Sequence, residues 1–271
     1  MRAPLVVKFG GELLEDRERL QTVTAAMARV AAAGDPLIIV HGGGKEIDAA
    51  LKVAGIEKQQ VDGLRITDEP TLDVVVAVLA GTVNTRFVAS LTTAGAAAVG
   101  LTGADAGCGL ADAAPPHRTV DGRAVDLGRV GIPSDAADMR VLITLTADGF
   151  VPVVACIGLD RDGRLFNVNA DTFAGHMAAR LQARRLVIAG TTAGVLDAAG
   201  GTLAELDAAA VNRLIHDRTA TAGMVAKLRA CLHALENGAD DVVIVDGRDG
   251  ASLEQAALAI PPRNATRLVA S

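Results

Sequence analysis

Lys8, Gly10 and Gly11 come between a short apolar run and the segment expected to form the first helix. A helix N-terminus presents unpaired backbone N–H groups and the positive end of a dipole, which both favour a phosphoryl group. Glycine lets that backbone approach a ligand closely, and a lysine adds a positive charge beside it. The pattern therefore indicates a phosphate-binding turn, although an ordinary strand-to-helix turn with a solvated lysine explains the same residues.

A second glycine turn repeats this pattern, because Gly42–Gly44 directly follows the apolar run Leu37–His41. Three successive glycines cost chain entropy unless the turn needs them. The turn is not a P-loop, which would need glycine at Ile39 and serine or threonine at Glu46. No expected strand leads into a dinucleotide-binding G-x-G-x-x-G either. His41 could act as a base, but at a strand end we interpret it as a hydrogen-bonded structural residue.

Polar and charged residues at three further places could complete such a site. Asn167 and Asn169 alternate with apolar residues just before Asp171, and they are typical of a polar wall or of an ordinary capped helix start, with Asn169 or Asp171 as the cap. Lys227 lies one turn into an apolar helix, where a surface lysine is the default explanation. Arg65 offers the planar fork that suits a carboxylate.

Composition excludes several classes of function. The 271 residues include 26 basic and 32 acidic side chains, for a net charge of −6, so no overall basic footprint for nucleic acid is expected. Aromatic residues are 2% of the chain, with no Tyr or Trp, which leaves little to stack bases on. Cys108, Cys156 and Cys231 form no CxxC pair, which favours a reducing compartment. With no signal-peptide pattern and no long uninterrupted apolar run, we expect a cytoplasmic protein without a membrane span.

The elements that must position these residues follow a βαβ pattern, in which short β-branched runs alternate with longer Ala- and Leu-rich segments. This predicts an α/β fold with a mainly parallel sheet. Strands are expected at Leu5–Phe9, Leu37–His41, Ala98–Leu101, Val151–Ile157, Arg185–Ala189 and Asp241–Val245. Helices are expected at Leu13–Ala33, Ala49–Ala54, Asp68–Ala94, Asp135–Asp148, Asp171–Gln182, Leu206–His216, Met224–Asn237 and Leu253–Ile260.

Local signals refine this pattern. Asp68 and Asp135 are expected to cap the helices that they begin. Gly103–Gly131 is expected to form antiparallel hairpins, and Asp162–Gly163 a hairpin turn. Strand–helix alternation restarts near residue 183, where we place a boundary between two lobes, residues 1–182 and 183–271.

In this order, the motifs resemble those of the amino acid kinase family, and among its members those that phosphorylate N-acetylglutamate. The matching stretches run from residue 5 to about residue 248 and are VVKFGGELL, IIVHGGGKEID, GLRITD, LAGTVNTRFVASL, VDLGRVG, GFVPVV, FNVNAD, TAGMVAKL and VVIVDGR. The resemblance implies a three-layer αβα sandwich. It also implies that the N-terminal lobe binds the amino-acid substrate and forms the dimer, and that the C-terminal lobe binds ATP.

The implied reaction is transfer of a phosphoryl group from ATP to the γ-carboxylate of N-acetyl-L-glutamate, the second step of arginine biosynthesis. By resemblance, Lys8 and Lys227 flank the transferring group and Asp171 holds both lysines. The other catalytic and substrate-binding residues implied are Gly11 and Gly44 at the phosphoryl group, and Gly43, Gly44, Arg65 and Asn167 at the amino acid. The implied ATP-binding residues are Gly10, Gly11, Thr191, Thr192, Gly194, Val195, Leu196, Thr221, Gly223 and Lys227. Mg²⁺ is expected to bind through the ATP phosphates, since no acidic metal cage is visible in the sequence.

The chain departs from the family pattern at four places. Thr191 stands where the nucleotide segment usually has Asp, and Ala106 ends what is usually Gly-x-Asp-Gly. Ala222 replaces the Asp before Gly-Met, and Ala265 replaces a glycine near the C-terminus. None of these changes removes an implied catalytic group, but they make the adenosine contacts the least secure part of the resemblance.

Assembly and alternative activities complete the expectations. Arginine-inhibited members carry an extra N-terminal helix that links dimers into a hexameric ring, and Lys8 lies too close to Met1 for such a helix. We therefore expect a homodimer paired through Asp68–Ala94. The alternatives are a kinase of a related, carrier-linked aminoadipate or glutamate, and a catalytically silent amino-acid-binding or nucleotide-binding regulator on the same fold.

Overall fold

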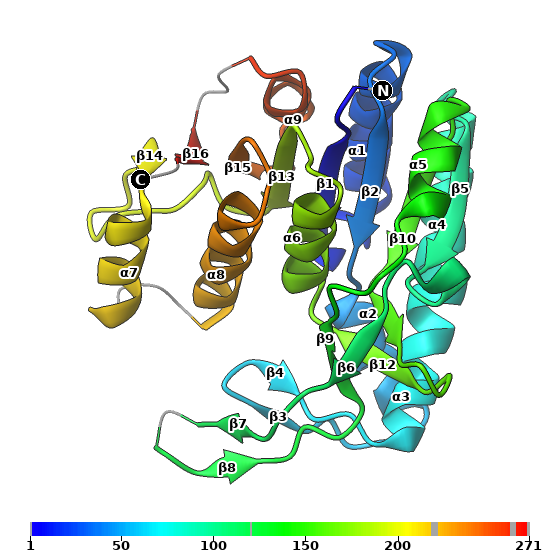
Figure 1. Ribbon diagram of the computed structural model, residues 1–271, viewed down its shortest axis with the longest axis vertical. Helices are drawn as coiled ribbons and strands as arrows, with labels where there is room; N and C mark the ends of the chain where they lie inside the picture. The colour runs from blue at the N-terminus through cyan, green and yellow to red at the C-terminus, as the bar shows by residue number, and fades with distance from the viewer. Residues whose placement is uncertain (1, 120, 218–221, 261–263, 270–271) are drawn as a thin grey trace.

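An eight-stranded sheet in the order β14-β16-β15-β13-β1-β2-β10-β5 forms the centre of the molecule (Figure 1). The computed structural model describes residues 2–119, 121–217, 222–260 and 264–269. Neighbouring strands are parallel except β15 and β16, which are antiparallel. The strands of this sheet are β1 (Leu5–Phe9), β2 (Leu37–His41), β5 (Ala98–Thr102), β10 (Val151–Ala155), β13 (Arg185–Gly190), β14 (Glu205–Leu206), β15 (Val242–Asp246) and β16 (Ala265–Leu268).

Helices cover both faces of this sheet, which confirms the α/β fold and the three layers. The helices are α1 (Arg17–Ala32), α2 (Gly44–Val53), α3 (Glu69–Val76), α4 (Asn84–Thr93), α5 (Arg140–Ala147), α6 (Ala170–Arg180), α7 (Ala208–His216), α8 (Ala222–Glu236) and α9 (Gly250–Ala257). Helices α6 and α8 pack side by side on one face, and α1 packs between α4 and α9 on the other (Figure 1). Strands β1, β2 and β10 are buried along their whole length, because helices cover them on both sides.

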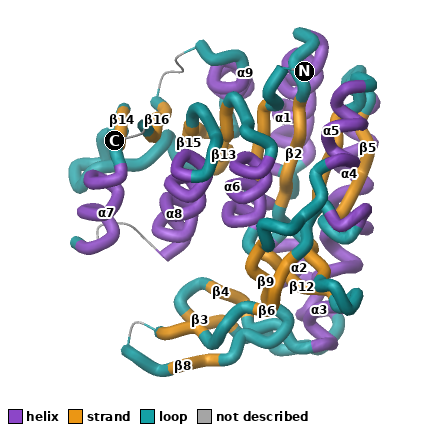
Figure 2. Tube along the Cα trace, in the orientation of Figure 1, coloured by secondary structure: helices purple, strands orange, loops and turns teal. Residues whose placement is uncertain are grey.

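Smaller sheets project from the carboxyl ends of the central strands (Figure 2). A four-stranded sheet has the order β11-β12-β9-β6, and two hairpins pair β3 with β4 and β7 with β8. These strands are β3 (Gln60–Val61), β4 (Leu64–Arg65), β6 (Ala111–Ala113), β7 (His117–Arg118), β8 (Ala124–Val125), β9 (Val130–Pro133), β11 (Ile157–Leu159) and β12 (Leu165–Val168). The antiparallel pairs β6–β9, β7–β8 and β11–β12 confirm the hairpins expected in Gly103–Gly131 and around Asp162–Gly163.

Several expected boundaries are wrong. The expected strand Val151–Ile157 is divided between β10 and β11, which lie in different sheets. The first helix begins at Arg17, after a short 3₁₀ turn at Gly11–Leu13, because Asp16 accepts hydrogen bonds from the backbone N–H groups of Glu18 and Arg19 and so caps it.

Two further helix starts and one helix interior also need correction. Asp135 caps no helix, because α5 begins only at Arg140. The helix expected at Ala49 begins at Gly44, since the glycine turn itself opens it. The helix expected over Asp68–Ala94 contains a π-helical turn at Ala77–Val83, although Asp68 caps its start as expected by accepting from Thr71 N–H. The edge strand β14 and its neighbour β16 were not expected.

The run Glu69–Thr93 is long and apolar enough, by length and composition alone, to cross a membrane. In the structure this run packs on α1, β5 and β10, with Leu79, Val83, Phe87 and Leu91 buried. The core helix of a soluble protein passes the same test, so the run is weak evidence for a membrane span. The absence of a membrane span stays a prediction.

Gly175 on α6 allows a close approach between α6 and α8. A Cβ atom at Gly175 would lie 2.5 Å from the backbone carbonyl oxygen of Ala230, so α6 and α8 would have to separate to admit one. These helices join the segments on either side of residue 183, because α6 precedes β13 and α8 follows it. The packing of α6 against α8 therefore requires glycine, which has no side chain, at position 175.

Gly175→Ala should lower the free energy of unfolding by about 1–3 kcal/mol relative to Gly81→Ala, the cost typical of overpacking. Gly81 is the control, since it also lies within a helical run and its Cβ would meet no atom within 4 Å. Urea unfolding measures the difference. Equal stability of the two variants would contradict the tight crossing.

Candidate active site

The two glycine turns lie in contact at the carboxyl ends of β1 and β2. These strands pair in parallel with Phe9 opposite His41, so Gly10–Gly11 and Gly42–Gly44 leave the sheet side by side. A Cβ atom at Gly11 would lie only 2.7 Å from Gly43 Cα, so glycine is required for this contact. Among the described residues the N–H groups of Gly11 and Gly44 donate no backbone hydrogen bond, as expected for helix N-termini, and they remain available to an anion.

Lys8 and Asp171 form a buried ion pair beside these turns. Lys8 Nζ lies 2.8 Å from Asp171 Oδ1, and the side chains are 8% and 13% exposed. Burial opposes both charges, but the Asp171 carboxylate raises the pKa of Lys8, and the Lys8 and Lys227 ammonium groups lower the pKa of Asp171. Both groups are therefore charged at neutral pH. Asp171 lies on the first turn of α6, where Asn169 caps the helix as expected.

Lys227 approaches the same carboxylate from α8. Its Nζ atom lies 3.3 Å from the position of a Cβ atom at Gly190, the last residue of β13, which is the strand next to β1. Burial and the positive charge of Lys8 lower the pKa of Lys227, whereas Asp171 raises it. The structure thus brings together the three charged residues predicted from the sequence, Lys8, Asp171 and Lys227.

A further acid, Glu12, was missed by sequence reasoning. Its carboxylate lies over Gly10, and its negative charge raises the pKa values of both Lys8 and Lys227. Glu12 directly follows the first glycine turn, and its side chain turns back over Gly10, two residues earlier. No sequence signal separates it from an ordinary acidic residue in a first helical turn.

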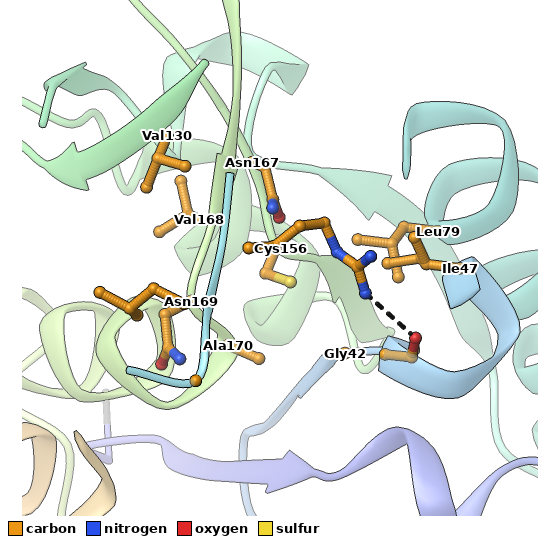
Figure 3. Close-up of a pocket in the computed structure, with 14 residues that line it drawn as sticks. Gly42, Ile47, Leu79, Val130, Cys156, Asn167, Val168, Asn169 and Ala170 are labelled. Carbon is orange, nitrogen blue, oxygen red and sulfur yellow. Dashed lines mark hydrogen bonds between the residues drawn. The ribbon is translucent and has the colours of Figure 1, made fainter. Parts of the chain in front are cut away.

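A small pocket of about 200 Å³ opens next to the second glycine turn (Figure 3). Gly42–Gly44, Arg65 and Asn167 line it, together with the apolar side chains of Ile47 and Leu79. This volume is below the range of pockets for drug-sized ligands, so the pocket suits a small metabolite. The predicted substrate residues are therefore brought together at one place.

Arg65 presents an unused hydrogen-bond donor in this pocket. Its Nη2 atom lies 2.5 Å from Asp48 Oδ1 and 3.3 Å from Gly44 O, whereas its buried Nη1 atom has no hydrogen-bond partner among the described residues. A buried, unpaired guanidinium nitrogen suits a carboxylate ligand. Asp48, which holds Arg65 in place, was not predicted. Asn167, which also lines the pocket, donates to Thr67 Oγ1 at 3.2 Å.

His41 is structural, as expected. Its Nδ1 atom lies 3.1 Å from the Gly42 carbonyl oxygen, which can only accept, so Nε2 is left to accept from Asn84 at 3.0 Å. Burial lowers the pKa of His41 to about 4, so the ring is neutral at physiological pH. A neutral ring with both nitrogens occupied holds the end of β2 and is not placed to exchange protons with a ligand.

The predicted nucleotide segment follows β13. Thr191 and Thr192 leave the sheet beside β1, and Gly194 adopts a positive φ of 76°. Val195 is buried, and its N–H group donates to Thr266 Oγ1 at 2.7 Å, so this donor is already used.

The other predicted nucleotide residues are Leu196, Gly223 and Thr221. Leu196 is exposed, and Gly223 is exposed at the start of α8. Thr221 lies outside the described residues. Nothing among the described residues gathers three or more His, Cys, Asp or Glu side chains that could hold a metal ion.

The chain belongs to the amino acid kinase family, whose model matches residues 3–246. Among its relatives, the acetylglutamate kinase of Sphingopyxis alaskensis is 42% identical over 248 residues, which cover 90% of this chain and 82% of that protein. The acetylglutamate kinase of Novosphingobium aromaticivorans is 40% identical over 252 residues, or 90% of this chain and 83% of that protein.

Solved structures agree with this fold. The N-acetylglutamate synthase of Neisseria gonorrhoeae, complexed with coenzyme A and N-acetyl-glutamate, superposes with a TM-score of 0.83 at 25% identity, over 98% of this chain and 59% of that one. Carbamate kinase from Giardia lamblia, bound to AMP-PNP, has a TM-score of 0.71 at 16% identity over 99% of both chains, a likeness of fold alone.

Asp171→Asn should destabilise the protein by about 3–5 kcal/mol at pH 7, because it leaves the buried Lys8 ammonium group without its counter-ion. The double variant Lys8→Met/Asp171→Asn should recover most of this loss, since it removes both charges. Urea unfolding of the wild type and the three variants (the two single changes and the double) gives the coupling free energy. An Asp171→Asn variant as stable as the wild type would rule out the ion pair as a stabilising contact.

The pH dependence of this coupling follows from the two pKa shifts. The pKa of Asp171 is lowered in the folded state, so its contribution is complete above its unfolded value and is lost as pH falls through the lowered value. The pKa of Lys8 is raised, so its contribution is complete below its unfolded value and is lost as pH rises through the raised one. The coupling should therefore stay constant between about pH 5 and about pH 9.

Proposed function

We propose that this chain transfers the γ-phosphoryl group of ATP to the γ-carboxylate of N-acetyl-L-glutamate, giving N-acetyl-L-glutamyl 5-phosphate. This is the second step of arginine biosynthesis. The observation that carries the proposal is the convergence of Lys8, Asp171 and Lys227 at the mouth of the two glycine turns. Binding alone rarely needs two lysines that meet at one acid, which favours an enzyme over a silent regulator.

The acceptor carboxylate is already ionised at neutral pH, so the reaction needs no strong general base. Catalysis then depends on position and on neutralisation of charge. Lys8 and Lys227 offset the charge that spreads over the transferring phosphoryl oxygens, and Asp171 keeps the two ammonium groups in place. The free N–H groups of Gly11 and Gly44 donate to the same oxygens.

The amino-acid end of the acceptor would occupy the small pocket. The unpaired Nη1 atom of Arg65 is the natural partner of the α-carboxylate, and Asn167 would fix the N-acetylamino group. Gly43 and Gly44 line this pocket, and Gly43 also contacts Gly11 of the first turn. The relatives from Sphingopyxis alaskensis and Novosphingobium aromaticivorans are acetylglutamate kinases, which supports acetylglutamate as the acceptor.

The lobe formed by residues 183–271 would bind ATP through Thr191, Thr192, Gly194, Val195, Leu196, Thr221 and Gly223, together with Gly10, Gly11 and Lys227. Because aromatic residues are 2% of the chain, aliphatic side chains and backbone would hold the adenine. Mg²⁺ would neutralise phosphate charge and be held through the ATP phosphates. Residues 1–182 would hold the acceptor and form a cytoplasmic homodimer through Glu69–Thr93, whose mass light scattering can measure.

Incubation with Mg-ATP and hydroxylamine should trap an acyl phosphate as its hydroxamate when N-acetylglutamate is the acceptor. Glutamate and N-acetylaminoadipate, tested in parallel, should give much less product, because the first lacks the acetyl group and the second is one methylene longer. A preference for aminoadipate or for a carrier-linked acceptor would move the assignment to the related kinases. No hydroxamate from any acceptor would exclude a carboxylate kinase.

Lys227→Ala should lower kcat by on the order of 10²-fold, because the lysine acts on charge that develops in transfer. Arg65→Ala should instead raise the KM for the amino acid about tenfold or more, the cost of a charged hydrogen bond. Lys58→Ala is the matched control, since Lys58 also pairs with Asp48, at 2.8 Å, but from the exposed side. Steady-state kinetics separate the effects, and an unchanged KM in Arg65→Ala would contradict the carboxylate contact.

A further inference from the structure

The second glycine turn rests on the helical run that contains the π-helical turn. A Cβ atom at Gly43 would lie 2.9 Å from Leu79 Cδ2 and 3.3 Å from Val83 Cγ2, so this run forms the floor of the turn. π-helical turns are rare in proteins, and those that occur often lie at functional sites. This run, Glu69–Thr93, contains the motif LAGTVNTRFVASL, to which the proposed reaction assigns no role.

Asn84, directly after the π-helical turn, holds the chain just before the glycines. Its Nδ2 atom lies 3.0 Å from His41 Nε2 and donates to the Val153 carbonyl oxygen at 2.8 Å. Asn84 and His41 are both buried. The residue that precedes Gly42 is therefore fixed to α4 and, through Val153, to the neighbouring strand β10.

Arg86, two residues further along α4, holds the chain just after the glycines. Its Nη2 atom donates to Glu46 Oε1 at 2.6 Å, and Glu46 is the third residue of α2, which begins at Gly44. The other carboxylate oxygen of Glu46 lies 3.7 Å from the position of a Cβ atom at Gly43. Asn84 and Arg86 thus bracket the second turn from both sides.

The same Arg86 nitrogen also donates to the carbonyl oxygen of Leu14 at 2.9 Å. Leu14 closes the short 3₁₀ turn that begins at Gly11, so one guanidinium group contacts the far ends of both glycine turns. These turns touch at Gly11 and Gly43, where neither has a side chain to keep them in register. The ladder between β1 and β2 ends with the hydrogen bond from Gly42 N–H to the Phe9 carbonyl oxygen, so beyond that bond the relative position of the turns depends on contacts from outside.

We propose that Arg86 is a positioning residue, whose contacts with Glu46 and Leu14 fasten the two glycine turns to α4 and so fix the separation of the Gly11 and Gly44 N–H groups. The inference rests on the proposed phosphoryl transfer, in which both N–H groups donate to one moving group. Displacement of such donors by about 1 Å can cost on the order of 10²-fold in rate. Arg86 does not itself touch a substrate in this assignment.

Arg86→Met keeps most of the side-chain length and removes the fastening donors. We expect kcat to fall about 10- to 100-fold, with the KM for N-acetylglutamate changed less than about threefold, because Arg65 and Asn167 are untouched. Glu46→Gln, which keeps an acceptor for Arg86, should lose less activity than Arg86→Met. Arg29→Met is the matched control, since Arg29 forms a comparable ion pair, 2.7 Å from Glu254, on the far side of α1.

Hydrogen–deuterium exchange tests the fastening independently of the acceptor. Peptides that cover residues 10–16 and 42–50 should exchange faster in Arg86→Met than in the wild type or in Arg29→Met. Unchanged exchange in both peptides would overturn the fastening, whether or not the wild type is a kinase.

The steady-state kinetics distinguish a failure of the positioning role of Arg86 from a failure of the proposed function. A kcat of Arg86→Met equal to that of the wild type would overturn the positioning role. A raised KM with unchanged kcat would also overturn it, because that result indicates that Arg86 binds the substrate. A wild-type enzyme that makes no hydroxamate would instead overturn the proposed function. In that case the exchange experiment still decides the fastening.

Discussion

The buried ion pair between Lys8 and Asp171 sets the conditions for the rest of the site. Each charge is stable in its buried position only because the other is 2.8 Å away, so the end of β1 and the start of α6 must meet. The parallel pairing of β1 with β2 and β13 then brings the second glycine turn and Gly190 to the same edge. Lys227 reaches this edge from α8, where burial and then the positive charge of Lys8 lower its pKa.

Residues that act through their own local sequence could be predicted well. A glycine run after an apolar strand marks a turn wherever it occurs, and Asn169 caps α6 because its side chain reaches N–H groups two and three residues ahead. The parallel order of the strands then places such turns together, because the carboxyl ends of parallel strands share one edge. Hence both glycine turns, Lys8 and Asp171 were predicted, and the structure brings them into contact.

Residues that act on distant partners could not be found in this way. Asp48 holds Arg65 from 17 positions away, and Arg86 contacts Glu46 across 40 positions and Leu14 across 72. An aspartate or arginine on an expected helix face looks the same whether its partner is solvent or a distant side chain. Boundaries failed for a related reason: Gly44 is a poor helix former, but the turn that it belongs to opens α2.

The central sheet crosses the expected boundary at residue 183 without interruption, since Leu5–Phe9 pairs with Arg185–Ala189 residue by residue. A hinge between the two halves would have to break that ladder of hydrogen bonds. A movement of residues 183–271 relative to residues 1–182 that keeps this ladder intact is therefore torsional, a change of sheet twist. Under torsion, points near the twist axis move least, so Lys8 on the interior strand β1 is displaced little while the outer strands sweep through the largest arcs.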